Sequence, residues 1–227
     1  MRKSILVLIV AAITALGYQA ATRQAPFGTH PITGRKIAGV MGMAGADWLV
    51  RPERVAEENP DGALDAMSIR PGMQIADLGA GVGYMTLRMA KRVGPSGKIY
   101  GVDLQPGMLA ELQKNAKAAG LTNIEPILGE PADPKLPAGK IDMVLMTDVY
   151  HEISQPQAML RKLREALKPD GRLVLLEYRA EDPAIPINPD HKMTVEQVRA
   201  EIEPEGFRLL PPIETLPRQH LLILVKR

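Results

Sequence analysis

Three alternating glycines follow a short apolar run that contains a carboxylate, and they carry the first chemical signal in this chain of 227 residues. Asp77 lies within the run at residues 75–78, and Gly79, Gly81 and Gly83 come directly after it. Glycine is needed where backbone approaches a ligand or adopts positive φ, and a strand leading into a helix presents free N–H groups at the edge of a sheet. The pattern therefore predicts a strand-to-helix turn that binds a nucleotide-like ligand.

The residue after the third glycine narrows the kind of ligand. A dinucleotide-binding turn has the form G-x-G-x-x-G/A, in which the last small residue lets the helix pack closely on the strand. This chain has Tyr84 at the position that should be small. The turn is therefore poorly suited to a pyrophosphate.

An acidic residue ends the next apolar run. Asp103 follows residues 98–102, about 20 to 25 residues after the glycine turn, which is the spacing at which an acid meets a ribose. One carboxylate can accept hydrogen bonds from both ribose hydroxyls. Asp103 is predicted to bind a ribose, although the same spacing serves nicotinamide enzymes and a strand-end aspartate can also cap a turn.

A cluster of polar side chains follows the fourth apolar run, at the sheet edge where ligands bind in such folds. His151 has the ordinary pKa range of a general base, Tyr150 could orient an acceptor or face a cation through its ring, and Glu152 could orient His151. A structural role for His151, hydrogen-bonded to a loop, is an equal alternative. His191 and His220 are isolated in the sequence and are interpreted as structural. No H-x-x-x-H or comparable spacing is present, so no metal site is predicted.

Short apolar runs alternate with helical patterns from residue 74 onwards, which predicts a doubly wound α/β fold. We expect a mostly parallel seven-stranded sheet with helices on both faces and a C-terminal antiparallel strand pair. Two short helices, separated by a turn at residues 59–62, should precede the first strand. The expected strands are 74–78, 98–102, 124–128, 141–146, 173–176, 207–210 and 221–225. Later helices are expected at 84–92, from Pro106, after Pro156, and after a capping box formed by Thr194 and Gln197.

Taken together, these features resemble the class I S-adenosylmethionine-dependent methyltransferases. The glycine turn is similar to motif I of that family, residues 147–152 occupy its motif IV position, and residues 167–173 resemble its L-K-P-G-G-R-L turn, with Asp170 replacing a glycine. The resemblance covers roughly residues 48–227. It implies that the cofactor is S-adenosylmethionine. The methyl group of this donor is already activated by the positive charge on sulfur, so orientation of the acceptor supplies much of the rate.

The resemblance also implies roles for individual residues. Asp103 would bind the adenosyl ribose, while Leu104 and Met108 would flank the adenine. An acid after the third strand would accept from the adenine amino group; Glu130 and Asp133 are both present, and Asp133 is slightly favoured because two prolines fix the loop around it. The expected catalytic residues are His151, Tyr150 and Glu152. The expected cofactor-binding residues are Asp77, Gly79, Ala80, Gly81, Gly83, Tyr84, Asp103, Leu104, Met108, Glu130, Asp133 and Asp148.

Composition excludes several classes of function. Lys+Arg 28 against Asp+Glu 26 leaves a net charge of +2, and no nucleic-acid-binding motif is visible, so we expect no nucleic-acid partner. The chain has no cysteine, which removes disulfides, thiolate nucleophiles and cysteine-ligated zinc.

The amino terminus has the pattern of a targeting segment. Arg2 and Lys3 precede an apolar run at residues 5–16, and small residues follow, which is typical of a secretory signal peptide cut after Gly17. The run has roughly 12 residues where a membrane span needs about 20, so a cleaved signal is favoured over an anchor, and a buried helix comes third. Export or anchoring would bring the protein near a membrane, although S-adenosylmethionine is made in the cytosol.

Three regions are therefore expected along the chain. Residues 1–21 form a signal peptide or anchor, and residues 47–227 form the S-adenosylmethionine-binding domain. Residues 22–46 form a linker or a lid that continues into Trp48, and the alternative is that their apolar side chains simply patch the core.

We expect a methyltransferase that acts on a small molecule through a nitrogen, oxygen or sulfur nucleophile. Two alternatives remain open. One is a nicotinamide-dependent oxidoreductase, which Tyr84 and the terminal strand pair disfavour. The other is a non-catalytic module that binds S-adenosylmethionine or S-adenosylhomocysteine.

Overall fold

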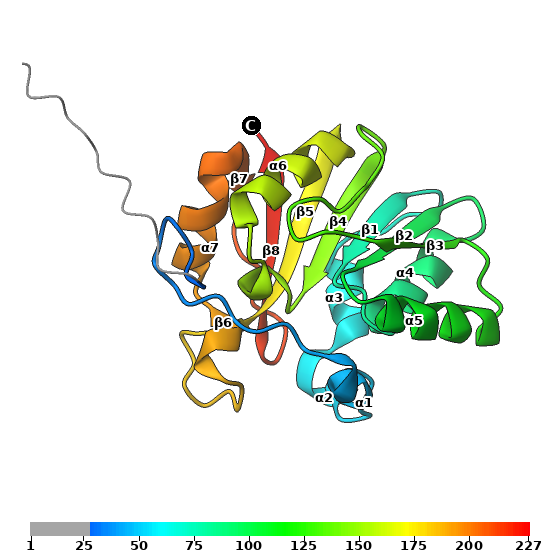
Figure 1. Ribbon diagram of the computed structural model, residues 1–227, viewed down its shortest axis with the longest axis horizontal. Helices are drawn as coiled ribbons and strands as arrows, with labels where there is room; N and C mark the ends of the chain where they lie inside the picture. Colours follow the sequence, from blue (N-terminus) through cyan, green and yellow to red (C-terminus); the bar gives the residue numbers. More distant parts are fainter. Residues whose placement is uncertain (1–27) are drawn as a thin grey trace, which may run out of the picture.

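The computed structural model describes residues 28–227, which form one mixed sheet with helices on both faces (Figure 1). The strands are β1 (Gln74–Leu78), β2 (Lys98–Asp103), β3 (Ile124–Leu128), β4 (Ile141–Thr147), β5 (Leu167–Arg179), β6 (Lys192–Met193), β7 (Phe207–Leu209) and β8 (Gln219–Lys226). The α-helices are α1 (Ala46–Leu49), α2 (Arg54–Glu58), α3 (Pro60–Ala66), α4 (Tyr84–Val93), α5 (Pro106–Ala118), α6 (Pro156–Ala166) and α7 (Val195–Ile202). Short 3-10 turns are η1 (Met43–Gly45), η2 (Tyr150–Glu152), η3 (Pro189–His191) and η4 (Glu203–Glu205).

The expected signal peptide or anchor at residues 1–21 lies outside the described residues. Among residues 28–227, no helix is long and apolar enough to cross a membrane.

The sheet has the order β3-β2-β1-β4-β5-β8-β7, in which the first five strands are parallel and β8 is antiparallel to both β5 and β7. The predicted fold class is therefore confirmed. An eighth strand, β6, was not predicted because it has only two residues, which pair with the end of β5 at Tyr178 and Arg179. Strand order reverses between β1 and β4, and the carboxyl ends of strands beside such a reversal are where ligands bind in open α/β sheets.

Alternation along the strands divides the core into two layers. Ile75 of β1 and Met143 of β4 belong to the cluster that contains residues of α3 and α4, whereas Ala76 and Val144 belong to the cluster that contains residues of α6 and α7. Helix α5 lies on the α4 side, because its Leu112 fills the space above Gly101 of β2. Successive side chains of a strand point to opposite faces of the sheet, and helices cover both faces. This explains why the predicted strands are continuously apolar.

Two local expectations were wrong. Residues 59–62 do not form a turn between helices: Pro60 is the first residue of α3, and the Asn59 side chain accepts a hydrogen bond from Gly62 N at 3.2 Å. Proline suits the first helical position because its missing N–H would have no partner there. The predicted turn at residues 168–171 lies within β5, where the register jumps between the pairs Ile141–Leu167 and Met143–Arg172.

The first described residues, 28–45, cross the carboxyl edge of the sheet, and we call them the N-terminal segment (Figure 1, blue). Arg35 binds Glu201 of α7 at 3.1 Å, Ala38 N donates to His151 O at 3.0 Å, and Met41 O accepts from Gln105 Nε2 at 2.8 Å. The segment thus spans from α7 to the start of α5. Its backbone is tied to both halves of the sheet edge.

Candidate active site

A cavity of about 700 Å³ lies at the carboxyl edge of the sheet, beneath the N-terminal segment. Its walls come from the ends of β1, β2, β4 and β5, from α1, and from the loop that contains η3. A smaller cavity adjoins it beneath the glycine turn. The residues that face the main cavity include Gly79, Gly81, Asp103, Leu104, Met108, Glu130, Asp148, His151, Glu152 and His191.

The glycine turn is built as predicted, and two of its positions admit no side chain. Gly79 has φ +76°, and an added Cβ would lie 2.4 Å from a methyl carbon of Val149. Gly83 has φ +97° and precedes α4, where a Cβ would lie 2.4 Å from Leu87 Cδ1. Gly79 faces the main cavity, while Gly83 lines neither cavity. Gly83 is therefore required for close packing at the start of α4.

Asp103 connects the turn to the second strand. Its carboxylate accepts from Gly81 N and from Gln105 N, both at 2.9 Å, and it is 9% exposed. Each oxygen uses one lone pair in this way and keeps capacity toward the cavity. Leu104 and Met108 face the cavity from the same side.

Asp77 and Tyr84 line the smaller cavity together with Ala80. Burial raises the pKa of Asp77 to about 6, the hydroxyl of Thr86 at 2.5 Å opposes that rise, and the Asp103 carboxylate adds to it. The Tyr84 ring lies beneath the guanidinium of Arg54, 4.2 Å from its centroid. A large aromatic residue at this position therefore forms part of the wall of the cavity.

Three buried polar atoms around these cavities have no hydrogen-bond partner among residues 28–227. They are Tyr84 OH, Thr147 Oγ1 and Asp148 Oδ1. Unsatisfied buried polar groups are costly, so their presence beside a cavity points to a polar ligand. Burial, with the nearby Glu58 and Glu177, raises the pKa of Asp148. The lining thus fits S-adenosylmethionine, since it offers a carboxylate with free acceptor capacity, apolar side chains and unpartnered polar atoms.

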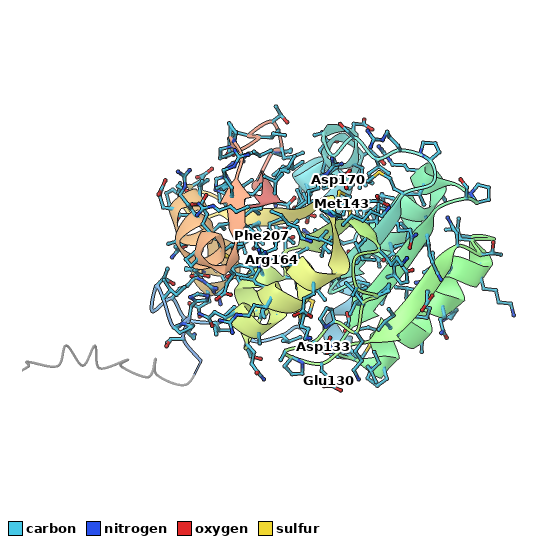
Figure 2. All side chains as sticks on the ribbon, turned by 90° about the horizontal axis from the view of Figure 1, so that it is seen from above. Glu130, Asp133, Met143, Arg164, Asp170 and Phe207 are labelled. Atoms are coloured by element: carbon cyan, nitrogen blue, oxygen red, sulfur yellow. The ribbon has the colours of Figure 1, made fainter. Side chains whose placement is uncertain are left out.

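The loop after β3 carries the two acids between which the sequence did not decide. Glu130 and Asp133 lie close together at one edge of the molecule (Figure 2), and their backbones form a reciprocal bridge. Glu130 faces the main cavity and pairs with Lys135 at 2.6 Å. Asp133 lines neither cavity, and its carboxylate accepts from Lys135 N at 2.8 Å. The preference for Asp133 is therefore not supported, and Glu130 is the better placed acid.

His151 lies at the opposite end of the cavity from Asp103 along the sheet edge, and Glu177 of β5 holds it. His151 Nδ1 lies 2.6 Å from Glu177 Oε2, and both side chains are almost fully buried. Burial lowers the pKa of His151, but the Glu177 carboxylate outweighs that effect, so the pKa is raised. Sequence reasoning gave the orienting role to Glu152, whereas the structure gives it to Glu177.

His191 is not isolated, contrary to the sequence interpretation. Its Nδ1 lies 3.1 Å from His151 Nε2 and 3.6 Å from Glu152 Oε1, and all three residues face the cavity. Burial lowers the pKa of His191, whereas burial raises the pKa of Glu152 to about 7. Within residues 28–227, His220 forms side-chain hydrogen bonds with Glu214 at 2.6 Å and with Glu181 at 2.9 Å, which fits its structural interpretation.

Tyr150 does not face the cavity, so its expected contact with an acceptor or a sulfonium is not supported. Its side chain is fully buried in the core beneath α6 and α7, and its hydroxyl lies 3.4 Å from His30 Nε2. Its backbone N donates to Glu177 Oε1 at 2.9 Å. Tyr150 therefore supports the pair formed by His151 and Glu177 from behind.

Two residues at this edge were missed as site residues. Glu177 is absent from the expected catalytic residues, although an acid that follows a buried apolar strand is itself a signal. Arg54 lies between the two cavities, where its Nε donates to Glu58 Oε2 at 2.6 Å and its Nη1 to Leu49 O at 2.8 Å. No local pattern in the sequence distinguishes Arg54 from an ordinary helix-surface arginine.

Comparison with known proteins identifies a family and relatives of the chain. A family profile described as a methyltransferase domain matches residues 69–207. The chain is 32% identical to nocamycin O-methyltransferase of Saccharothrix syringae over 62% of this chain and 48% of that protein. The chain thus spans less than two thirds of the curated relatives that head the comparison.

Solved structures share the fold. A SAM-dependent methyltransferase from Aquifex aeolicus matches with a TM-score of 0.76 at 24% identity, over 82% of this chain and 98% of that one. The [4+2]-cyclase SpnF matches with a TM-score of 0.59 at 21% identity, over 68% of this chain and 59% of that one. On the match of the family profile, which covers more than half of its residues, the chain belongs to the methyltransferase domain family.

Proposed function

We propose that this protein transfers a methyl group from S-adenosylmethionine to a small-molecule acceptor. The observation that carries the proposal is the single cavity that joins the glycine turn and Asp103 at one end to His151 at the other, where the buried Glu177 holds the His151 ring. Similarity to nocamycin O-methyltransferase supports an organic acceptor that reacts through oxygen. When bound, the cofactor supplies an electrophilic methyl group on a positively charged sulfur.

The residues of the chain divide the work between binding and orientation. Asp103 binds the ribose, and Thr147 and Asp148 supply polar atoms to the amino-acid part of the cofactor. The N-terminal segment covers the cavity and excludes water. His151, held through Nδ1 by Glu177, presents Nε2 to the acceptor and can take its proton.

The first test separates this function from a nicotinamide-dependent activity. S-adenosylhomocysteine should raise the melting temperature, and NAD should not, because only a ligand of the folded state stabilises it by mass action. Stabilisation by NAD alone would reject the proposal.

The second test separates an enzyme from a binding module. Methyl transfer from labelled S-adenosylmethionine is measured against phenols, amines and thiols. We expect His151→Ala to bind S-adenosylhomocysteine normally and to lose about 100-fold in turnover, whereas the matched variant His220→Ala keeps its activity. Binding without turnover on any acceptor would identify a non-catalytic module.

We also propose that residues 1–21 export or anchor the protein. The support is the charged and then apolar pattern of that segment, together with apolar side chains exposed near the cavity, Val40 at 52%, Trp48 at 40% and Leu104 at 42%. To test this, the chain is produced in a bacterial host, and its molecular mass is measured in the membrane, soluble and exported fractions. An intact chain found only in the soluble cell fraction would reject it.

A further inference from the structure

Three potential metal ligands meet at the acceptor end of the cavity. They are His151 Nε2, His191 Nδ1 and a carboxylate oxygen of Glu152, and these atoms all lie within 4.8 Å of one another. The two nitrogens are 3.1 Å apart, and His191 Nδ1 is 3.6 Å from Glu152 Oε1. Two imidazoles and one carboxylate form a donor set that binds zinc and related transition metals in proteins.

We propose that His151, Glu152 and His191 bind a divalent transition-metal ion of the zinc class. Zinc lies about 2.0–2.2 Å from nitrogen and oxygen ligands, so tetrahedral geometry separates neighbouring ligand atoms by about 3.3–3.6 Å. The separation between the two histidine nitrogens, 3.1 Å, lies just below that range, and that between His191 Nδ1 and Glu152 Oε1, 3.6 Å, lies at its upper end. All three ligand atoms lie within 4.8 Å of one another, so side-chain rotations are enough to complete the site.

Glu177 adds an observation that is independent of the three ligands. Histidine ligands usually donate their second ring N–H to a carboxylate, which fixes the tautomer and the direction of the ligating nitrogen. The fully buried Glu177 carboxylate lies 2.6 Å from His151 Nδ1 and is itself held by Tyr150 N at 2.9 Å. With the proton on Nδ1, the lone pair of His151 Nε2 points toward the cluster.

The charges around the cluster also favour a cation. Glu152 and Glu177 form ion pairs only with histidines among residues 28–227, and with no lysine or arginine. The arginine and the lysine of the N-terminal segment pair with other carboxylates, Arg35 with Glu201 and Lys36 with Asp190, and Arg35 reaches His151 only through its backbone O, at 3.0 Å. Two carboxylates at 0% and 14% side-chain exposure therefore lack a fixed positive partner.

The remaining coordination positions would open toward the acceptor, because all three ligands line the main cavity. A bound cation lowers the pKa of a heteroatom that coordinates to it, and the released proton passes to water. This use of the ion rests on the proposed function, whereas binding of the ion does not. A nitrogen that ligates a metal cannot accept a proton, so His151 Nε2 serves as the general base only in the metal-free chain, and with the ion bound the proton of the acceptor passes to water instead.

Metal titration of the tag-free chain, after treatment with EDTA, tests the proposal without any activity assay. We expect one Co²⁺ per chain with a visible absorption band that Zn²⁺ displaces, and azide should shift this band if open positions face the cavity. His191→Ala should abolish the band, and Glu177→Gln should weaken Co²⁺ binding by about 10- to 100-fold.

His220→Ala is the matched control, because His220 also lies between two carboxylates but has no second histidine beside it. It should bind Co²⁺ like the unmodified chain. Circular dichroism and the melting temperature establish that each variant is folded. Absence of a band, a band unchanged in a folded His191→Ala, or no response to azide would overturn the proposal. Failure of methyl transfer alone would leave it standing.

Discussion

The two ends of the cavity are built in different ways. The cofactor end is built around residues 77–108, which form consecutive elements from β1 to the start of α5, and the loops after β3 and β4 add Glu130 and Asp148. The acceptor end gathers His151, Glu177 and His191 from η2, β5 and η3, beneath the N-terminal segment. The first end is a local motif, whereas the second exists only once distant segments have folded together. Substitutions should therefore affect binding of the cofactor at one end and chemistry at the other.

The largest effect is expected for Asp103→Ala at the cofactor end. Loss of charge-assisted hydrogen bonds to the ribose, and of the bonds to Gly81 N and Gln105 N, should weaken S-adenosylhomocysteine binding by about 100-fold or more. Isothermal titration calorimetry measures this. Asp133→Ala, on the neighbouring loop, should bind within about twofold of the unmodified chain. A larger loss for Asp133→Ala would restore the original preference for that residue.

Asp77 should make stability depend on pH. The gap between the ordinary aspartate pKa of 3.8 and about 6 in the fold corresponds to about 3 kcal/mol. Because the folded pKa is the higher one, this stability is present below pH 3.8 and is lost as the pH rises through about 6. Asp77→Asn, which stays neutral, should therefore be more stable than the unmodified chain at pH 8 and equal to it at pH 3.5 in urea unfolding. The exposed Asp170→Asn (Figure 2) should show no such crossover.

Gly79→Ala tests whether position 79 requires glycine because of its positive φ alone or also because of the limited space beside Val149. Positive φ should cost about 1 kcal/mol, and the contact with Val149 should add to it, for a total loss of about 2 kcal/mol. Gly139→Ala is the control, because Gly139 has φ +63° with nothing within 4 Å of an added Cβ. Equal losses for the two variants would mean that crowding by Val149 contributes nothing.

The smallest effect is expected for Tyr150→Phe. This variant removes the hydroxyl contact with His30 at 3.4 Å and leaves the Tyr150 backbone bond to Glu177 intact. Stability should fall by about 1 kcal/mol or less, and turnover should stay within about twofold. A turnover loss comparable with that of His151→Ala would return Tyr150 to the reacting groups.

The difference between the two ends also explains what the sequence could predict. Strand-helix alternation, the glycine turn and Asp103 are local patterns, and the predicted fold class follows from the alternation. The capping box of α7 was equally local, and Thr194 and Gln197 bond reciprocally as expected. Each of these depends on residues that are close in the chain.

The acceptor end was predicted less well because the side chains of consecutive residues point in different directions there. In the 3-10 turn η2, successive side chains point about 120° apart, so Tyr150 enters the core while His151 and Glu152 face the cavity. His191 reaches His151 across 40 residues, through a loop whose path no periodicity encodes. The absence of a close histidine spacing therefore could not exclude a metal site.

The N-terminal segment covers the cavity but precedes the residues that the family profile matches. The family profile begins at residue 69, yet residues 28–49 supply the cover of the cavity through Ile37, Met41, Trp48 and their neighbours. The matched part thus contains the glycine turn, Asp103 and the acceptor-end residue His151, whereas the segment that covers the cavity lies outside it. Exchanging residues 28–49 between members of the family should accordingly change which molecule is methylated while cofactor affinity persists.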